Sequence, residues 1–429
     1  MATTPVPAST GSRQSSAPLR ALRSRSFTIL LFGNLLSNTG TWMQQVAEPW
    51  LVLRLSNSPF LLGLDSFMGD APIWLLILAG GVLADRRDRR KTALFFQGIQ
   101  VVCPVLLVVL LATGHIHVWI VIAMSLVVGV TDALSGPSIN ALVPSSVPEE
   151  DVASAVALNS AQFNVSRVLG PFLAGVVMAT LGPIACFALN AASYAPYLLA
   201  IYLLRIPVRL SQETPAARAA TGAGQSLFGA VGAIAKKPRL RRALSTVVVT
   251  SVFCLPTLTF IPVLVRDGFH LGSTEFGGAL SVFGFGGLLG AGIVLGVRTN
   301  RRRQLLSSLA ALCLGLLTVA AALGKIFWVE MVLLFFTGGA MVASNTAANT
   351  ILQSSIDGRI RGRVSSLYTL ALRGGAPLGN LATGLVVSRW GIRTALLANG
   401  VLAVVCHAAV MSWGRSRARA PVGTPGAGS

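Results

Sequence analysis

The stretch that decides the fold is residues 71–91, which read APIWLLILAGGVLADRRDRRK. It holds the end of an apolar run over 60–83 and then five basic residues among the six positions 86–91. An apolar run of about 20 residues crosses a bilayer as a helix, and basic residues collect in its cytoplasmic loops. The stretch therefore predicts a membrane-spanning helix that is followed by a cytoplasmic loop.

The composition extends this prediction to the whole chain. Its 429 residues are 53% hydrophobic and only 11% charged, with a mean hydropathy of +0.71. Soluble domains carry about 25% charged residues, so this chain has too little polar surface for a soluble enzyme or a disordered protein. The net charge is +20, but the arginines cluster in short loops between apolar runs, and this distribution argues against a nucleic-acid partner. We expect an all-α integral membrane protein.

The cysteines and histidines show no ligand spacing. Each of the five cysteines stands alone inside an apolar run and is expected to pack as a small hydrophobic side chain. The four histidines are scattered along the chain. We therefore expect no metal ion and no cofactor.

Apolar runs of spanning length recur along the chain, and they fall into two groups of six. A polar linker, 205–242, separates a first bundle, 27–204, from a second bundle, 243–413. Residues 1–26 are predicted to be a disordered tail, and residues 414–429 form a second tail. The twelve predicted spans are 27–53, 60–83, 92–113, 116–138, 153–180, 183–204, 243–265, 274–297, 304–323, 326–352, 363–388 and 392–413.

The basic residues fix the orientation of these spans. With both termini in the cytoplasm, 27 of the 34 lysines and arginines lie on the cytoplasmic side and five on the outer side. This is the asymmetry of the positive-inside rule, and the opposite orientation would violate it. We expect a multi-pass protein of the cell membrane with cytoplasmic termini.

The two bundles also share a short repeat. Arg167-Val-Leu-Gly-Pro171 in the fifth span matches Arg373-Gly-Gly-Ala-Pro377 in the eleventh. Parallel repeats of six helices are one way in which secondary transporters are built. The repeat favours two related bundles around a central path.

The loop after the second span carries a resemblance to a known family. Its residues, from Gly81 to Lys91, resemble the loop signature of the major facilitator superfamily, at the position where that family places it. Asp88 stands where the general pattern has glycine, as in the branch of the enterobactin exporter and the macrolide-efflux permeases. The stretches 40–45 and 159–175 resemble the same branch. The resemblance covers 27–413 and implies a twelve-helix transporter.

The resemblance implies a gate at this loop. The family places the acid at Asp85 against the start of span eleven, where it holds the cytoplasmic side shut. Close helix packing is expected at Gly80 and Gly81, and Arg89 is expected to pair with Asp132. The alternative is an ordinary basic loop. The expected gating residues are Gly81, Asp85, Arg86, Arg89, Arg90 and Asp132.

A second motif lies in the fifth span. Gly170-Pro171 and Gly175 resemble the fifth-helix signature of exporters in the superfamily, and Asn164 belongs to the same stretch. Small residues allow close packing, and proline bends a helix. The motif favours export over uptake, and the alternative is a generic proline kink.

Ionisable residues inside spans are costly and indicate function. The coupling candidates are Glu48, Asp70, Arg167 and Arg373. We expect Glu48 and Asp70 to carry protons and Arg167 to be their partner or an anion contact; a static ion pair is the alternative. Asp65 is expected near the outer interface.

Other features of the spans bear on the mechanism. In span four, residues 119–138 lack the arginine of many drug–proton antiporters, so their coupling mechanism is not carried over. Polar side chains inside spans are expected to line a cavity or to bond between helices. These are Asn34, Asn38, Gln45, Asn159, Asn164, Asn345, Asn349 and Asn380.

The sequence therefore predicts a secondary active transporter that exports a small amphipathic molecule, such as a drug, an antibiotic or a siderophore-like compound, by proton antiport. The alternatives are a lipid or polar-solute transporter of the same fold and, further away, a non-transporting receptor or an enzyme. No nucleotide-phosphate loop of the G-x-x-x-x-G-K type is present, which argues against an ATP-driven pump. The expected partners are the small-molecule substrate, protons and membrane lipids, and we expect a monomer.

Overall fold

The computed structural model describes residues 19–204, 237–297, 299–354 and 361–416, together with residues 232, 234 and 235. Most of the predicted linker and of the two predicted tails lies outside these residues, as does the side chain of Asp85. Within the described parts of the chain, every regular element is a helix.

The first half of the chain forms seven long helices. The second of the six predicted spans is divided, because Pro72 lacks a backbone N–H and begins a new helix directly after Ala71. The helices are α1 (Arg25–Ser56), α2 (Pro59–Asp70), α3 (Pro72–Arg86), α4 (Arg89–Thr113), α5 (Val118–Ser145), α6 (Val152–Thr180) and α7 (Pro183–Leu203).

The second half begins with a composite span. Two π-helical segments, η4 (Thr250–Cys254) and η5 (Leu264–Gly268), follow and extend the α-helices there. The last element, α15, consists of two helices that meet at Gly391, where a φ of 80° and a ψ of 166° interrupt the helix. The helices are α10 (Pro238–Val249), α11 (Leu255–Val263), α12 (Ser273–Gly296), α13 (Asn300–Leu323), α14 (Phe327–Ser354) and α15 (Arg361–Ser416).

Nine segments of the described chain are long and apolar enough to cross a membrane. The predicted number of twelve differs at three places. The helix α1 is not among the nine, α2 and α3 are too short when taken separately, and 367–412 is one continuous segment. The all-helical class is confirmed, and the count of twelve stays a prediction.

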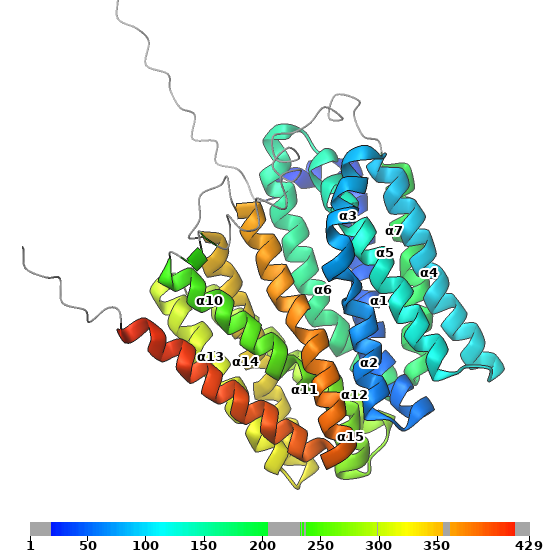
Figure 1. The fold of residues 1–429 in the computed structure, drawn as a ribbon. Helices are drawn as coiled ribbons and strands as arrows, with labels where there is room; N and C mark the ends of the chain where they lie inside the picture. The colour runs from blue at the N-terminus through cyan, green and yellow to red at the C-terminus, as the bar shows by residue number, and fades with distance from the viewer. Residues whose placement is uncertain are drawn as a thin grey trace, which may run out of the picture.

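The helices of the two halves form two groups that converge at the end of the molecule opposite the termini (Figure 1). There α2 packs along α15 and α6 packs along α12. Added Cβ atoms at Gly63 and Gly175 would lie 2.6 Å from the Asn380 carbonyl and 2.3 Å from the Gly277 carbonyl, so the backbones touch. We call this end, which contains Asn57 and Gly391, the closed end.

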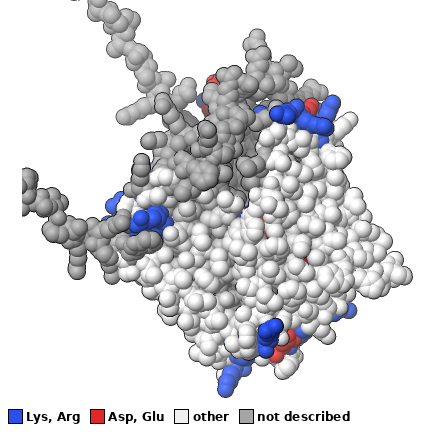
Figure 2. All heavy atoms as spheres, viewed as in Figure 1, with Lys and Arg blue, Asp and Glu red and all other residues white. Residues whose placement is uncertain are grey.

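Charge is concentrated at the two ends of the molecule. Figure 2 shows blue and red atoms at the closed end and near the opposite end, with a broad uncharged face between them. Large apolar side chains such as Phe95, Trp119 and Phe336 are exposed on the helices between these ends. An apolar face of this kind is suited to contact lipid.

The predicted disordered tail is wrong for the residues near α1. Arg20–Arg23 form a 3₁₀ helix, and Arg20 makes ion pairs of 2.9 Å to Glu150 and 3.0 Å to Asp151. The Ser24 side chain caps α1, and its hydroxyl donates to the Ser146 carbonyl. These contacts fix the described part of the tail against the α5–α6 connection.

Candidate transport and coupling site

Two acids from different helices meet at one hydroxyl group. Ser125 of α5 lies 2.6 Å from Oε1 of Glu48 on α1 and 2.7 Å from Oδ1 of Asp65 on α2. Asp65 is only 5% exposed, and its position relative to the outer interface stays a prediction. The three side chains form a compact acidic cluster inside the first half of the molecule.

The geometry of this cluster requires a proton. The Ser125 hydroxyl carries one hydrogen, and it also lies 3.0 Å from the Val121 carbonyl of its own helix. An ionised carboxyl group only accepts hydrogen bonds. Both short contacts are therefore satisfied together only when at least one of the two carboxyl groups is protonated and donates to the serine oxygen. The Glu48–Ser125–Asp65 cluster is consequently able to hold a proton.

Further amides hold Glu48 in place. The Gln44 side chain donates to Oε2 of Glu48 at 3.1 Å, one helical turn away on α1. Asn190 of α7 in turn donates to Gln44 at 2.7 Å. A chain of hydrogen bonds thus runs from α7 through α1 to α5 and α2, and it fixes the position of the carboxyl group.

A second ionisable cluster joins the two halves. Nη1 of Arg373 on α15 donates to Oδ2 of Asp132 on α5 at 2.8 Å, and both act electrostatically on Asp70 at the end of α2. The predicted pair of Arg89 with Asp132 is therefore wrong: the Arg89 guanidinium donates to the Ala84 carbonyl in the last turn of α3. Arg373, which is 241 residues from Asp132 in the sequence, is its partner instead.

The Arg373–Asp132 pair is accessible to water. Its side chains are 32% and 41% exposed. Ion pairs with this exposure contribute only about 0–1 kcal/mol, since water competes for both charges. A contact of this strength between the halves is easily broken and reformed.

Arg167 also reaches across the molecule. Its side chain on α6 acts electrostatically on Tyr368 of α15, whose hydroxyl donates to the Asn345 carbonyl at 3.4 Å. The structure therefore places Arg167 with Tyr368, and not in the cluster around Glu48. Of the two arginines that the sequence places inside spans, Arg373 makes an ion pair between the halves and Arg167 lies near the opposite half.

The fifth-span motif packs α6 between two helices. A Cβ at Gly170 would lie 2.2 Å from Cβ of Trp42 on α1, and a Cβ at Gly175 would lie 2.1 Å from the Ser281 hydroxyl on α12. Only glycine permits these approaches. Pro171 is buried in the same segment. Asn164 is exposed, and its amide donates to the Ser160 carbonyl of its own helix.

In the predicted gating loop, the two glycines differ in their packing, and Asp88 caps a helix. A Cβ added at Gly80 would lie 2.3 Å from the Ala133 carbonyl oxygen of α5, whereas a Cβ added at Gly81 would have no neighbouring atom within 4 Å. The expectation of close packing is thus correct for Gly80 and wrong for Gly81.

Asp88 caps α4 by accepting hydrogen bonds from the backbone of Arg90 and Lys91. An acid directly before a helix is a signal for such a cap.

The arginines of this loop have separate environments. Arg86 is exposed at the end of α3. Arg90 bonds to the Tyr202 carbonyl at the end of α7 and lies over the Tyr202 ring, 5.5 Å from its centre. The proposed partner of Asp85, the start of α15, has its first side chains outside the described residues.

Several of the predicted polar residues bond between helices. The Asn34 amide of α1 donates to Asn159 and Gln162 of α6 at 3.2 and 3.3 Å, and Asn38 donates to Asn34. Asn380 of α15 donates to the Ser66 hydroxyl of α2 at 2.6 Å, which is a contact between the halves. These amides therefore hold helices together.

The fold and the matching relatives identify a membrane transporter of the major facilitator type rather than an enzyme. The chain belongs to the transmembrane secretion effector family, whose sequence model matches residues 15–419.

Characterised relatives match most of the chain. The multidrug efflux pump Tap of Mycobacterium tuberculosis is 26% identical, over 88% of this chain and 90% of its own length. The staphyloferrin A transporter of Staphylococcus aureus is 24% identical, over 82% and 87%. Macrolide efflux protein A of Streptococcus pyogenes is 23% identical, over 85% and 90%.

Solved structures support the fold. A bacterial homolog of the human lysosomal transporter Spinster, in an inward-facing and unoccupied conformation, has a TM-score of 0.70 at 15% identity, over 92% of this chain and 98% of that one. The nucleoside transporter NupG has a TM-score of 0.68 at 14% identity, over 91% and 99%.

Proposed function

We propose that this protein is a secondary active transporter that exports a small amphipathic molecule across the cell membrane in exchange for protons. The observation that carries the proposal is the contact of Glu48 and Asp65 with the single hydroxyl of Ser125. Relatives named as a multidrug pump, a siderophore transporter and a macrolide efflux protein support small-molecule export.

The proposed topology has twelve spans in two bundles, 27–204 and 243–413, with both termini and the linker 205–242 in the cytoplasm. In this topology α2 and α3 together form one span, and α15 forms two spans that meet at Gly391. The excess of basic residues, 27 against five, supports the orientation. The closed end then faces outward, and the exposure of the Arg373–Asp132 pair supports assigning this conformation to a state that is open to the cytoplasm.

The transport cycle is one of alternating access. Export requires the closed end to open, so the contacts of α2 with α15 and of α6 with α12 must separate there. The outward-facing state lets a proton reach the Glu48–Ser125–Asp65 cluster, and the inward-facing state lets the proton leave. Asp70, Asp132 and Arg373 lie where both halves contribute, and we propose that they stabilise the inward-facing state and meet the substrate.

Inverted membrane vesicles test this function directly. An imposed pH gradient should drive uptake of a subset of a chemically diverse compound panel, which includes drugs, macrolides and siderophores. Collapse of the gradient by a protonophore should abolish accumulation. Accumulation that persists without a proton gradient would show that another energy source drives the protein.

A further inference from the structure

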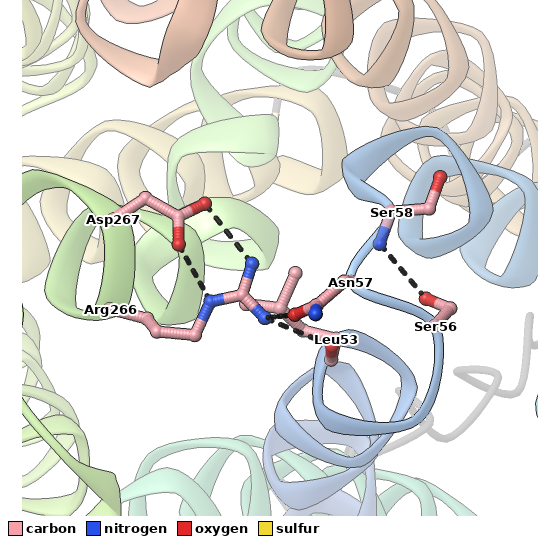
Figure 3. Close-up of polar contacts among 6 residues, drawn as sticks. All are labelled: Leu53, Ser56, Asn57, Ser58, Arg266 and Asp267. Atoms are coloured by element: carbon pink, nitrogen blue, oxygen red, sulfur yellow. Dashed lines mark hydrogen bonds and ion pairs between the residues drawn. The ribbon is translucent and has the colours of Figure 1, made fainter.

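The closed end contains a contact between the halves that none of the motifs above accounts for. Arg266 belongs to the π-helical segment η5 at the end of the seventh span. Its Nη1 atom donates to the Leu53 carbonyl at 3.0 Å and to the Asn57 side-chain oxygen at 2.6 Å, both at the end of α1 (Figure 3). We propose that this contact is a latch that holds the outer gate shut and opens in every transport cycle.

The end of α1 is suited to receive an arginine. Asn57 terminates α1 in the left-handed region, with a φ of 52°, and its backbone N–H also bonds to the Leu53 carbonyl. The last carbonyls of a helix carry partial negative charge, which attracts a cation. The guanidinium therefore binds a carbonyl and a side-chain amide that the chain reversal presents side by side.

The latch lies next to an aromatic contact between the halves. Trp50 of α1 stacks on Phe276 of α12, with ring centres 5.1 Å apart and an angle of 14° between the planes. Trp50, Arg54 and the three latch residues line a pocket of about 200 Å³. The stack and the latch thus lie next to each other on the same two halves, so both must separate when this end opens.

The ion pair at the latch lies within one half. Nε and Nη2 of Arg266 donate to the two carboxylate oxygens of Asp267 at 2.6 and 3.2 Å. When the halves part, Arg266 keeps Asp267 and loses only Leu53 and Asn57. Opening therefore leaves Arg266 paired with a carboxylate, so it avoids the cost of separating an ion pair. Water reaches the pair as well, since the two side chains are 27% and 41% exposed.

This inference rests on alternating access, and its test measures the gate rather than transport. Spin labels at Thr113 and Thr274, which are exposed at the closed end on opposite halves, report opening as a longer distance. The labels are placed in full-length protein whose five cysteines are replaced and whose transport is retained. Asn57→Gly removes the side-chain acceptor and keeps the left-handed turn, because glycine favours that conformation.

The expected result is an increase of about tenfold in the ratio of open to closed populations in Asn57→Gly and in Arg266→Gln, which corresponds to about 1.4 kcal/mol. Arg389→Gln removes an exposed charge at the same end and should leave the ratio unchanged. Wild-type populations in both latch variants would overturn the latch. A single fixed distance in the wild type at every pH and substrate concentration would overturn alternating access, and the latch with it.

Discussion

Neutralising one acid of the Glu48–Ser125–Asp65 cluster should uncouple transport without stopping it. Glu48→Gln and Asp65→Asn each imitate a protonated carboxyl group of similar shape. Such proteins should still exchange substrate across the membrane, because exchange needs both conformations and no proton release. They should not accumulate substrate against a gradient, since the cluster can no longer load and release a proton.

The magnitude follows from the geometry. The two carboxyl oxygens are at most 5.3 Å apart, the sum of their distances of 2.6 and 2.7 Å to the same atom. At an effective dielectric constant of about 20, two charges at this separation repel by about 3 kcal/mol. The wild-type protein should therefore lose stability as the pH rises and both acids ionise. Each single variant has only one ionisable carboxyl group in the cluster, so this repulsion should not lower its stability.

Two assays check this reasoning. Thermal unfolding in detergent should show both single variants more stable than the wild type at about pH 9, and equal to it at about pH 5. Substrate counterflow should persist in both, whereas uphill transport should be lost. The control Glu149→Gln changes an exposed acid and should behave as the wild type in all assays. Uphill transport by both single variants, or a stability difference that does not depend on pH, refutes a shared proton.

Three further outcomes are expected. Reporter fusions after residue 220 should lie in the cytoplasm and fusions within 54–59 outside, as the distribution of basic residues requires. Asp85→Asn should insert at wild-type abundance but export much less, because a charge at a helix terminus is worth about 0.3–2 kcal/mol; quantitative immunoblots beside vesicle transport decide this. Gly175→Leu should lower the abundance of folded protein, since the side chain would collide with the α12 backbone, whereas Gly81→Ala faces open space and should be tolerated; size-exclusion profiles compare the two.

The sequence predicts what depends on local physics. Hydropathy identifies the apolar runs, and Pro72 marks the break between α2 and α3 because proline cannot continue a hydrogen-bonded helix. Glu48 stands out as an acid inside a span, and its hydrogen bond to Gln44 follows from a spacing of four residues. These features need no knowledge of how the helices pack.

The remaining features depend on which helix faces meet. Asp65 and Ser125 are 60 residues apart, and no pattern indicates that their side chains share a contact. Arg373 replaces Arg89 as the partner of Asp132 because tertiary packing brings α15 to α5. Arg266 carries no sequence signal beyond its position in an outer loop, since its acceptors are a carbonyl and the amide of a helix end.

One short segment of α1 contains residues of both the proposed proton site and the proposed latch. Glu48 belongs to the acidic cluster, Trp50 stacks on the opposite half, and Leu53 with Asn57 receives the Arg266 latch. Pro49, between the first two, removes a backbone hydrogen bond, so this part of the helix can change direction at low cost. A change of charge at Glu48 therefore acts on a segment that already touches the other half at two points. By contrast, Asp132 and Arg373 contact each other directly across the halves and do not involve α1. There are thus two separate contacts between the halves, one next to the proposed proton site and one at the proposed substrate site. In the proposed cycle each ligand would favour a different conformation, and this difference would couple their movements.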